Sequence, residues 1–200
     1  MISDLPIAIA RFFFGATIRW VNCQPSTRQR IYFANHTSNL DLVALLLGLP
    51  KSMRELTRPA AAHDYWTANK FRYYVATKIF NAVLIERKKV TAHNNPVDLM
   101  LEAIGNKYSL VIFPEGRRNT EPEIAPFKSG LYHLGKKRPD IELIPVHIDN
   151  LNRILPRGEI LPVPILSCIS FGAPLQMMEN ETKTDFLERA RRAVIQLHQT

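Results

Sequence analysis

The stretch Ile31-Tyr32-Phe33-Ala34-Asn35-His36-Thr37-Ser38-Asn39-Leu40-Asp41 joins one apolar run to another through a short polar segment. Residues 31–34 predict a short buried strand, and residues 40–49 predict a helix that Gly48 and Pro50 end. The polar segment is therefore a strand-to-helix junction. It places a histidine five residues ahead of a carboxylate.

His36 and Asp41 fit two interpretations. On one continuous helix they would point roughly 140° apart, because each residue turns a helix by about 100°, so His36 must precede the helix if the two are to pair. Ser38 is then a candidate N-cap, and Asp41 in the first turn orients the imidazole as a general base near neutral pH. The alternative is structural: Ser38 and Asp41 form a capping box, and His36 is only a junction residue.

Apolar runs alternate with amphipathic segments along the rest of the chain. Further strands are predicted at residues 53–62, 82–85, 110–113, 141–148 and 165–171, and helices at residues 64–79, 94–105, 128–134 and 186–197. This alternation favours an α/β fold: a single-domain sandwich with a mainly parallel mixed sheet flanked by helices. Ligands of such folds gather at the carboxyl ends of strands, where His36, Arg87 and Glu115 fall.

A second polar junction, Phe113-Pro114-Glu115-Gly116-Arg117-Arg118, follows the strand predicted at residues 110–113. Gly116 permits a positive φ or a close backbone approach, and the two arginines offer forked donors to a phosphate. Arg87, which Lys88 and Lys89 follow, ends another predicted strand. Taken singly, each cluster also fits an exposed charged loop, and Glu115 also fits a structural ion pair.

The chain has 200 residues and a hydrophobic content of 46%, which is enough for one domain with a core. Its net charge is +8, and residues 51–90 hold nine basic and three acidic residues, so six of the eight net charges lie there. This concentration suits phosphate-bearing partners such as anionic lipid surfaces, nucleotide-like cofactors or nucleic acid; a basic solvent-exposed face is the alternative. No helix-turn-helix, RNP-like or zinc pattern accompanies it, which argues against nucleic acid.

Cys23 and Cys168 have no metal-ligand spacing, so neither a metal site nor a disulfide framework is predicted, and a reducing cytosolic compartment fits best. Residues 1–22 are expected to form an apolar region ahead of a domain at 23–200. Arg11 and Arg19 interrupt this region, which is too short in uncharged length to span a bilayer. Its arginines and phenylalanines predict a helix that lies in the membrane interface; the alternative is a helix packed on the core.

The junctions, in this order, resemble the motifs of the glycerolipid acyltransferase (lysophospholipid acyltransferase) family, typified by bacterial 1-acylglycerol-3-phosphate acyltransferase. The family's first motif, Asn-His-x-x-x-x-Asp, matches Asn35, His36 and Asp41. The third, Phe-Pro-Glu-Gly-x-Arg, matches residues 113–118, with Arg117 in place of the usual small hydroxyl residue.

The remaining motifs match less closely. The second, a glycine six residues before an arginine, matches at Arg87, with Asn81 in place of the glycine. The fourth, a proline within an apolar strand, looks like Ile144-Pro145-Val146, and Phe127-Lys128-Ser129-Gly130 resembles the segment that commonly follows the third motif. The resemblance covers residues 31–146, more than half of the chain.

The resemblance implies transfer of a fatty acyl group from acyl-CoA or acyl-ACP to the free hydroxyl of a lysophosphatidate-like acceptor, in phospholipid biosynthesis. His36 would act as general base and Asp41 would orient it. The candidate substrate-binding residues are Arg87, Glu115, Gly116, Arg117, Arg118 and Lys128. Neither a metal nor a cofactor beyond the acyl thioester is expected. The expected partners are an anionic membrane surface, the acyl carrier and the lysophospholipid, without nucleic acid, at the cytoplasmic face of the cell membrane.

Three alternatives stay open at this point. The acceptor could instead be glycerol-3-phosphate or another lyso-lipid. The same histidine, aspartate and arginines also suit a phosphate-ester hydrolase that uses no acyl donor. The third alternative is a module that binds anionic membranes without catalysis.

Overall fold

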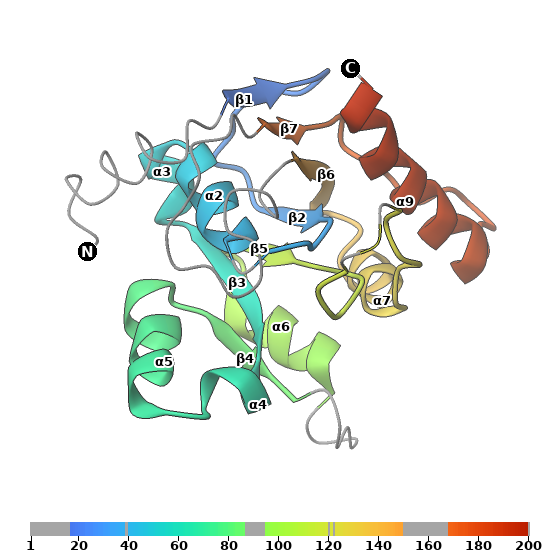
Figure 1. The fold of residues 1–200 in the computed structure, drawn as a ribbon. Helices are drawn as coiled ribbons and strands as arrows, with labels where there is room; N and C mark the ends of the chain where they lie inside the picture. Colours follow the sequence, from blue (N-terminus) through green and yellow to red (C-terminus); the bar gives the residue numbers. More distant parts are fainter. Residues whose placement is uncertain are drawn as a thin grey trace.

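A seven-stranded sheet organises the computed structural model, which describes residues 17–38, 40–86, 95–119, 121, 123–149 and 168–199. The strand order is β1-β7-β6-β2-β5-β3-β4 (Figure 1). The strands are β1 (Thr17–Trp20), β2 (Arg30–Ala34), β3 (Thr57–Ala62), β4 (Val83–Ile85), β5 (Ser109–Ile112), β6 (Glu142–Asp149) and β7 (Cys168–Phe171). The five strands β6, β2, β5, β3 and β4 run parallel, β7 is antiparallel to β6, and β1 is parallel to β7. The prediction of a mainly parallel mixed sheet is confirmed.

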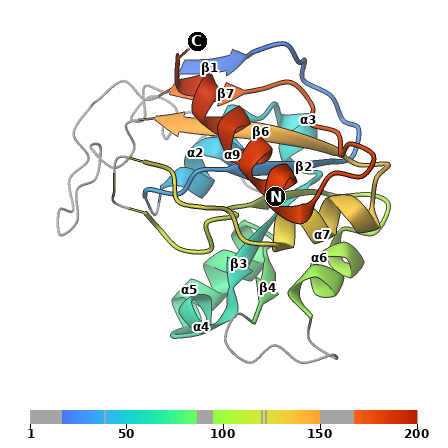
Figure 2. The same cartoon turned by 90° about the vertical axis from the view of Figure 1, so that its right-hand side faces the viewer.

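Helices cover both faces of this sheet. The helices of the described residues are α2 (Asp41–Gly48), α3 (Lys51–Arg54), α4 (His63–Trp66), α5 (Lys70–Tyr74), the π-helix η1 (Val75–Ile79), α6 (Pro96–Ile104), α7 (Gly130–Lys137) and α9 (Lys183–Gln199). Helices α2 and α3 pack on one face, and α6, α7 and α9 pack on the other, where α9 crosses the sheet (Figure 2). The fold is therefore the predicted α/β sandwich.

Strand β2 lies in the middle of the sheet and supplies both halves of the core. Its side chains point alternately to opposite faces. Ile31 and Phe33 pack with the residues of α6, α7 and α9, whereas Tyr32 and Ala34 pack with those of α2. All four are at most 1% exposed. Burial on both faces is the reason that β2 is apolar from Ile31 to Ala34 rather than alternating.

Two predicted elements are more finely divided than expected. The segment predicted as one strand over residues 53–62 begins with helix α3, which follows Pro50 and buries Met53, and only then enters β3. The segment predicted as one helix over residues 64–79 is divided into α4, α5 and η1, because the Asn69 side chain accepts the Arg72 N–H and starts a new helix.

Residues 17–20 were expected to belong to an interfacial helix, and this is wrong. They form β1, which pairs in parallel with β7, because the alternating side chains Ile18 and Trp20 pack against the core on the α2 face of the sheet. The rest of that predicted helix, residues 1–16, lies outside the described residues, as do residues 165–167 of the last predicted strand. In the part of the chain that is described, no helix is long and apolar enough to cross a membrane.

Candidate active site

His36 lies two residues beyond the end of β2, and Asp41 is the first residue of α2. His36 Nδ1 lies 2.8 Å from Asp41 Oδ2. Asp41 is fully buried, whereas the His36 side chain is 22% exposed. Because a carboxylate oxygen only accepts hydrogen bonds, the Nδ1 atom carries a proton and Nε2 can accept one. The junction therefore holds an oriented imidazole at the carboxyl edge of the sheet.

The expected N-cap role of Ser38 is wrong. The N-cap position of α2 is Leu40, which makes no side-chain cap, and the Ser38 hydroxyl accepts the Leu40 N–H at 3.2 Å. Asp41 provides the fixed acceptor of the junction, since its Oδ2 also accepts the backbone N–H groups of Thr37 at 2.6 Å and Ser38 at 2.8 Å. One carboxylate thus shapes the loop and orients the histidine.

Within the described residues Glu115 forms no ion pair, although a structural ion pair was one expectation. Its carboxylate is 3% exposed and accepts two backbone N–H groups, that of His36 on Oε1 at 2.8 Å and that of Ala125 on Oε2 at 3.0 Å. It therefore joins the end of β2 to the segment that leads into α7. Sequence spacing alone could not reveal this, because both donors belong to the main chain.

The turn after β5 holds His36 at two further points. The Asn119 N–H donates to the His36 carbonyl at 2.7 Å. The Phe113 ring stacks on the imidazole, with centroids 4.3 Å apart. Strands β2 and β5 are neighbours with Phe33 opposite Ile112, so the two junctions meet at adjacent strand ends, as the sequence predicted. The roles of Phe113 and Asn119 had not been predicted.

Gly116 adopts a φ of +70°, as its position in the turn required. A Cβ atom built there would lie 2.7 Å from Nζ of Lys128 and 2.9 Å from its Cδ and Cε atoms. The Lys128 side chain therefore lies directly against the glycine, and its backbone N–H donates to the Pro114 carbonyl at 2.9 Å. The structure brings Lys128 into the turn, 12 residues away in sequence.

Arg117 is exposed and Arg118 is half-buried on the same turn. Among the described residues, neither forms an ion pair. With Lys128 they place three cations close to the His36 loop. Arg87 lies outside the described residues, so its role stays a prediction. Strand β4, which ends two residues before Arg87, terminates at the same edge of the sheet. Asn81, two residues before β4, has a φ of +50°, a conformation that asparagine tolerates better than most residues.

Asn35 was matched only as a motif residue, and the structure gives it a role. Its buried amide donates to the Ile148 carbonyl at 2.9 Å and accepts the Ile148 N–H at 2.8 Å. This two-way bond fixes the end of β2 against β6, directly before His36. Within the described residues, no group of three or more histidine, cysteine, aspartate or glutamate side chains could hold a metal ion.

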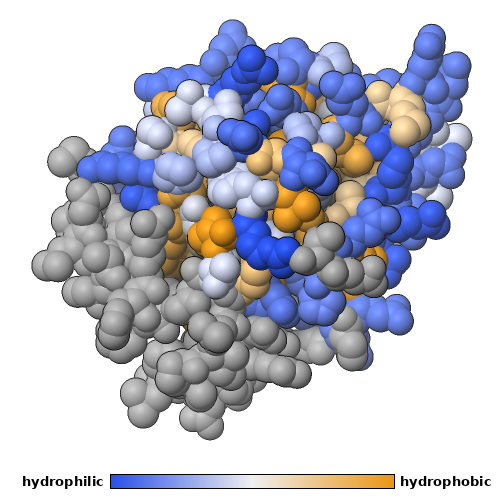
Figure 3. All heavy atoms as spheres, turned by 90° about the horizontal axis from the view of Figure 1, so that it is seen from above, coloured by the Kyte–Doolittle hydropathy of each residue, from blue (hydrophilic) through white to orange (hydrophobic). Residues whose placement is uncertain are grey.

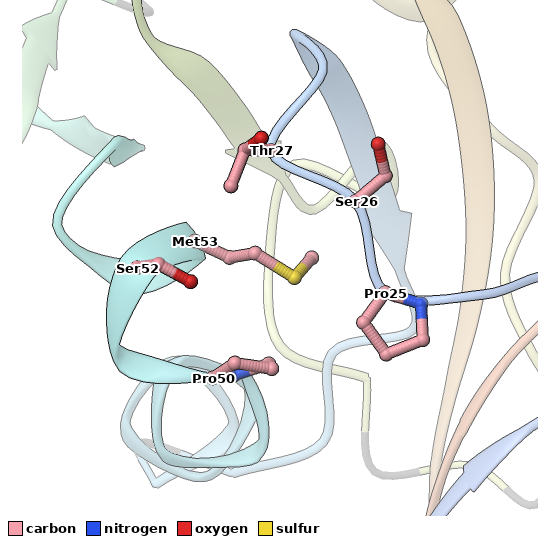
Figure 4. A pocket seen from close by; sticks show the side chains of 6 residues that line it. All are labelled: Pro25, Ser26, Thr27, Pro50, Ser52 and Met53. Carbon is pink, nitrogen blue, oxygen red and sulfur yellow. The ribbon is translucent and has the colours of Figure 1, made fainter.

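An open pocket of about 300 Å³ lies elsewhere, between α3 and the segment before β2 (Figure 4). Its lining is Pro25, Ser26, Thr27, Pro50, Ser52 and Met53. These residues precede β2 or follow α2, so they lie toward the amino edge of the parallel strands. The pocket is therefore separate from the His36 site.

The fold is that of a known enzyme structure. The crystal structure of the 1-acyl-sn-glycerophosphate (LPA) acyltransferase PlsC from Thermotoga maritima matches with a TM-score of 0.67 and 19% identity, over 100% of this chain and 85% of that one. At this identity the similarity defines the fold class alone.

The sequence comparisons define the family. The Acyltransferase family profile matches residues 18–149, and the chain belongs to this family. The matched region contains both junctions and Lys128; we call the part of the second junction that holds Arg117 and Arg118 the cationic turn.

Curated relatives match the chain over 108 to 143 residues. 1-Acyl-sn-glycerol-3-phosphate acyltransferase alpha of Mus musculus is 25% identical over 143 residues, which are 68% of this chain and 47% of the relative. The 1-acyl-sn-glycerol-3-phosphate acyltransferase of Cocos nucifera is 27% identical over 129 residues, which are 60% of this chain and 40% of the relative. The putative 1-acyl-sn-glycerol-3-phosphate acyltransferase acl-1 of Caenorhabditis elegans is 30% identical over 108 residues, which are 54% of this chain and 39% of the relative. The chain thus spans less than half of each of these relatives.

Proposed function

We propose that the protein transfers a fatty acyl group from an acyl thioester, on coenzyme A or acyl carrier protein, to the free hydroxyl of a lysophosphatidate-like acceptor. The observation that carries this proposal is the 2.8 Å contact between His36 Nδ1 and Asp41 Oδ2, with the imidazole part-exposed beside the cationic turn. Family membership and the printed names of the relatives support the choice of reaction.

His36 acts as the general base in this mechanism. Its Nε2 takes the proton of the acceptor hydroxyl as the hydroxyl oxygen attacks the thioester carbonyl carbon. The C–S bond then breaks, and the thiolate of the carrier leaves with the proton that the imidazolium returns. Asp41 fixes the tautomer and stabilises the imidazolium; catalysis of this kind contributes about 10²- to 10⁴-fold in rate.

The acceptor phosphate binds to the cations of the turn. Arg118 and Arg117 offer bidentate donors, and Lys128 adds a point charge beside Gly116. Arg87 is proposed as a further phosphate ligand. Glu115 takes a positioning role in place of the proposed substrate contact, because both of its carboxylate oxygens accept backbone N–H groups.

The acceptor class calls for a membrane surface, where lysophospholipids partition. We therefore include an anionic membrane surface among the partners and place the reaction at the cytoplasmic face of the cell membrane. No cofactor beyond the acyl thioester takes part in this scheme.

The test incubates the protein with radiolabelled acyl-CoA or acyl-ACP and with lysophosphatidate, glycerol-3-phosphate or another lyso-lipid, and identifies the products by mass spectrometry. We expect acylated lysophosphatidate with the wild type and a loss of about 10²-fold or more with His36→Ala. His133→Ala, at an exposed position on α7, is the matched control. Full activity in His36→Ala contradicts the mechanism. Release of phosphate without acyl transfer identifies the hydrolase instead.

A further inference from the structure

Exposed apolar side chains gather on one part of the molecule. We call residues 63–79, which form α4, α5 and η1, the α4–η1 projection; it lies at the end opposite β1 and β7 (Figure 1). The large hydrophobic residues that are exposed in the described part of the chain are Tyr65, Phe71, Tyr73, Tyr74, Ile79 and Met178. All but Met178 belong to the projection, so the apolar surface is local. At the opposite end, seen from above in Figure 3, the described residues that are visible are mainly hydrophilic with scattered apolar spots.

The fold does not need these outward side chains for packing. A separate small core beneath the projection consists of Ala61, Ala76 and Ala82, with Trp66, Phe80 and Leu84 packed against it. Phe71 is 76% exposed and Tyr74 is 57% exposed. Exposed aromatic residues clustered in this way mark an interaction surface more often than an ordinary surface.

Basic side chains accompany the aromatic ones. Phe71, Tyr74 and Lys78 follow one another at spacings of three and four residues, so they share one side of the α5–η1 helix. Lys70 and Lys78 are exposed and, within the described residues, form no ion pair. The Arg72 guanidinium lies 4.6 Å from the centroid of the Tyr65 ring. Aromatic rings beside cations are the composition of surfaces that bind the headgroup region of anionic bilayers.

The projection also has a defined position relative to His36. Helix α4 begins at His63, directly after the carboxyl end of β3. Strands β2, β5 and β3 are parallel neighbours, so α4, where the projection begins, and His36 lie at the same edge of the sheet. A bilayer docked at α4 would lie at the edge of the sheet where the proposed acceptor meets the histidine.

We propose that the α4–η1 projection docks the protein on an anionic phospholipid bilayer, with Phe71 and Tyr74 in the interface and Lys70 and Lys78 at the lipid phosphates. This names the membrane-contacting surface of the proposed function. The proposal rests on the proposed function in one respect, the advantage of bringing the active site to the bilayer. Binding to the bilayer itself needs no catalysis.

The first test is flotation with vesicles of phosphatidylcholine containing phosphatidylglycerol, compared with phosphatidylcholine alone. We expect binding only to the anionic vesicles. Lys70→Gln with Lys78→Gln should lower the partition coefficient about 25-fold, since each surface cation contributes about fivefold. Lys107→Gln with Lys183→Gln removes the same charge from exposed positions elsewhere and should lower it far less. An equal loss in both pairs overturns the proposal, because net charge alone would then explain the binding.

The aromatic part has its own variants. Phe71→Ser with Tyr74→Ser should reduce binding about tenfold or more, whereas Met178→Ser, at the exposed apolar residue outside the projection, should not. In Phe71→Trp the fluorescence should shift to the blue when anionic vesicles are added, and in Met178→Trp it should stay unchanged. Unchanged binding of the serine pair overturns the proposal. A change in the sedimentation velocity of this serine variant without lipid also overturns the proposal, because it would identify a contact between copies of the chain.

Activity separates this proposal from the proposed function. On a short-chain, monomeric lysophosphatidate the variants of the projection should keep wild-type kcat and KM, and on vesicle-bound acceptor their kcat/KM should fall. A loss on both acceptors overturns docking as the role of the surface. A wild type that binds vesicles through the projection but transfers no acyl group contradicts the proposed function and leaves the docking proposal supported.

Discussion

The Glu115 carboxylate accepts the backbone N–H of His36 at 2.8 Å, across the gap between the ends of β5 and β2. Together with the bond from the Asn119 N–H to the His36 carbonyl, it fixes both polar groups of the histidine main chain. The third sequence motif therefore positions the first. The two junctions form one structural unit, in which the imidazole has its orientation from Asp41 and its main-chain position from the turn after β5.

Glu115→Gln should weaken this unit. The amide keeps one oxygen acceptor but turns an NH₂ group toward one of the two backbone donors. We expect the free energy of unfolding to fall by about 1–3 kcal/mol, measured by urea denaturation, and kcat to fall although the proposed mechanism gives this residue no substrate contact. Glu123→Gln, at an exposed position nearby, should change neither quantity. Normal stability with reduced substrate affinity in Glu115→Gln would instead indicate that Glu115 contacts the substrate directly.

Asp41→Asn should separate folding from chemistry. The asparagine oxygen can still accept the Thr37 and Ser38 N–H groups and the His36 Nδ1–H at the Oδ2 position, but the neutral amide has no negative charge to stabilise the imidazolium. We expect kcat to fall about 10²- to 10⁴-fold with a KM near that of the wild type. Asp98→Asn, at an exposed residue of α6, is the control. Wild-type kcat in Asp41→Asn would exclude a His–Asp mechanism.

Gly116→Ala and Gly130→Ala should have opposite effects. Gly116 has a φ of +70°, and its Cβ would meet the Lys128 side chain. We expect a stability loss of about 1–3 kcal/mol and a raised KM for the phosphate-bearing acceptor, because Lys128 must move. Gly130 has nothing within 4 Å of its Cβ position and begins α7, so alanine there should be neutral or stabilise by up to about 1 kcal/mol. Equal melting temperatures for the two variants would contradict this.

Arg118→Ala should raise the KM for lysophosphatidate about 10- to 100-fold, the loss of one or two charge-assisted hydrogen bonds at about 1.5–3 kcal/mol. Arg117→Ala should have a smaller effect, because this side chain is more exposed. Steady-state kinetics with an acceptor that lacks the phosphate should show no difference between the variants and the wild type. Arg192→Ala, 70% exposed on α9, is the control. A KM unchanged in both turn variants would remove the arginines from phosphate binding.

The sequence predicted the sheet class and the meeting of the two junctions because both follow from short-range patterns. Apolar runs such as that of β2 mark buried strands, and parallel strands bring their carboxyl ends to one edge. The Asp41–His36 contact was predictable for the same reason, since it spans five residues in one loop.

Contacts with the main chain were not predictable. The bonds of Glu115 to His36 and Ala125 and of Asn35 to Ile148 depend on the relative position of strands that are distant in sequence. The strand β1 was missed for a related reason. An apolar stretch with arginines has the composition of an interfacial helix, and only its pairing with β7 determines that residues 17–20 are extended.

His147 should make the fold sensitive to acid. It is 9% exposed on β6, and burial, with a smaller contribution from the charge of His198 and an opposing one from Asp149, lowers its pKa to about 4. In the unfolded chain a histidine has a pKa of about 6.5, so between pH 4 and 6.5 the unfolded chain binds more protons than the folded one. The free energy of unfolding is therefore highest above pH 6.5 and falls as the pH drops toward 4. The loss in the free energy of unfolding across this pH range approaches about 3 kcal/mol. Urea denaturation from pH 4.5 to 7.5 should show this loss in the wild type and a smaller slope in His147→Gln. His133→Gln, at an exposed site, should keep the wild-type slope; identical slopes in all three proteins would show that His147 titrates normally in the folded state.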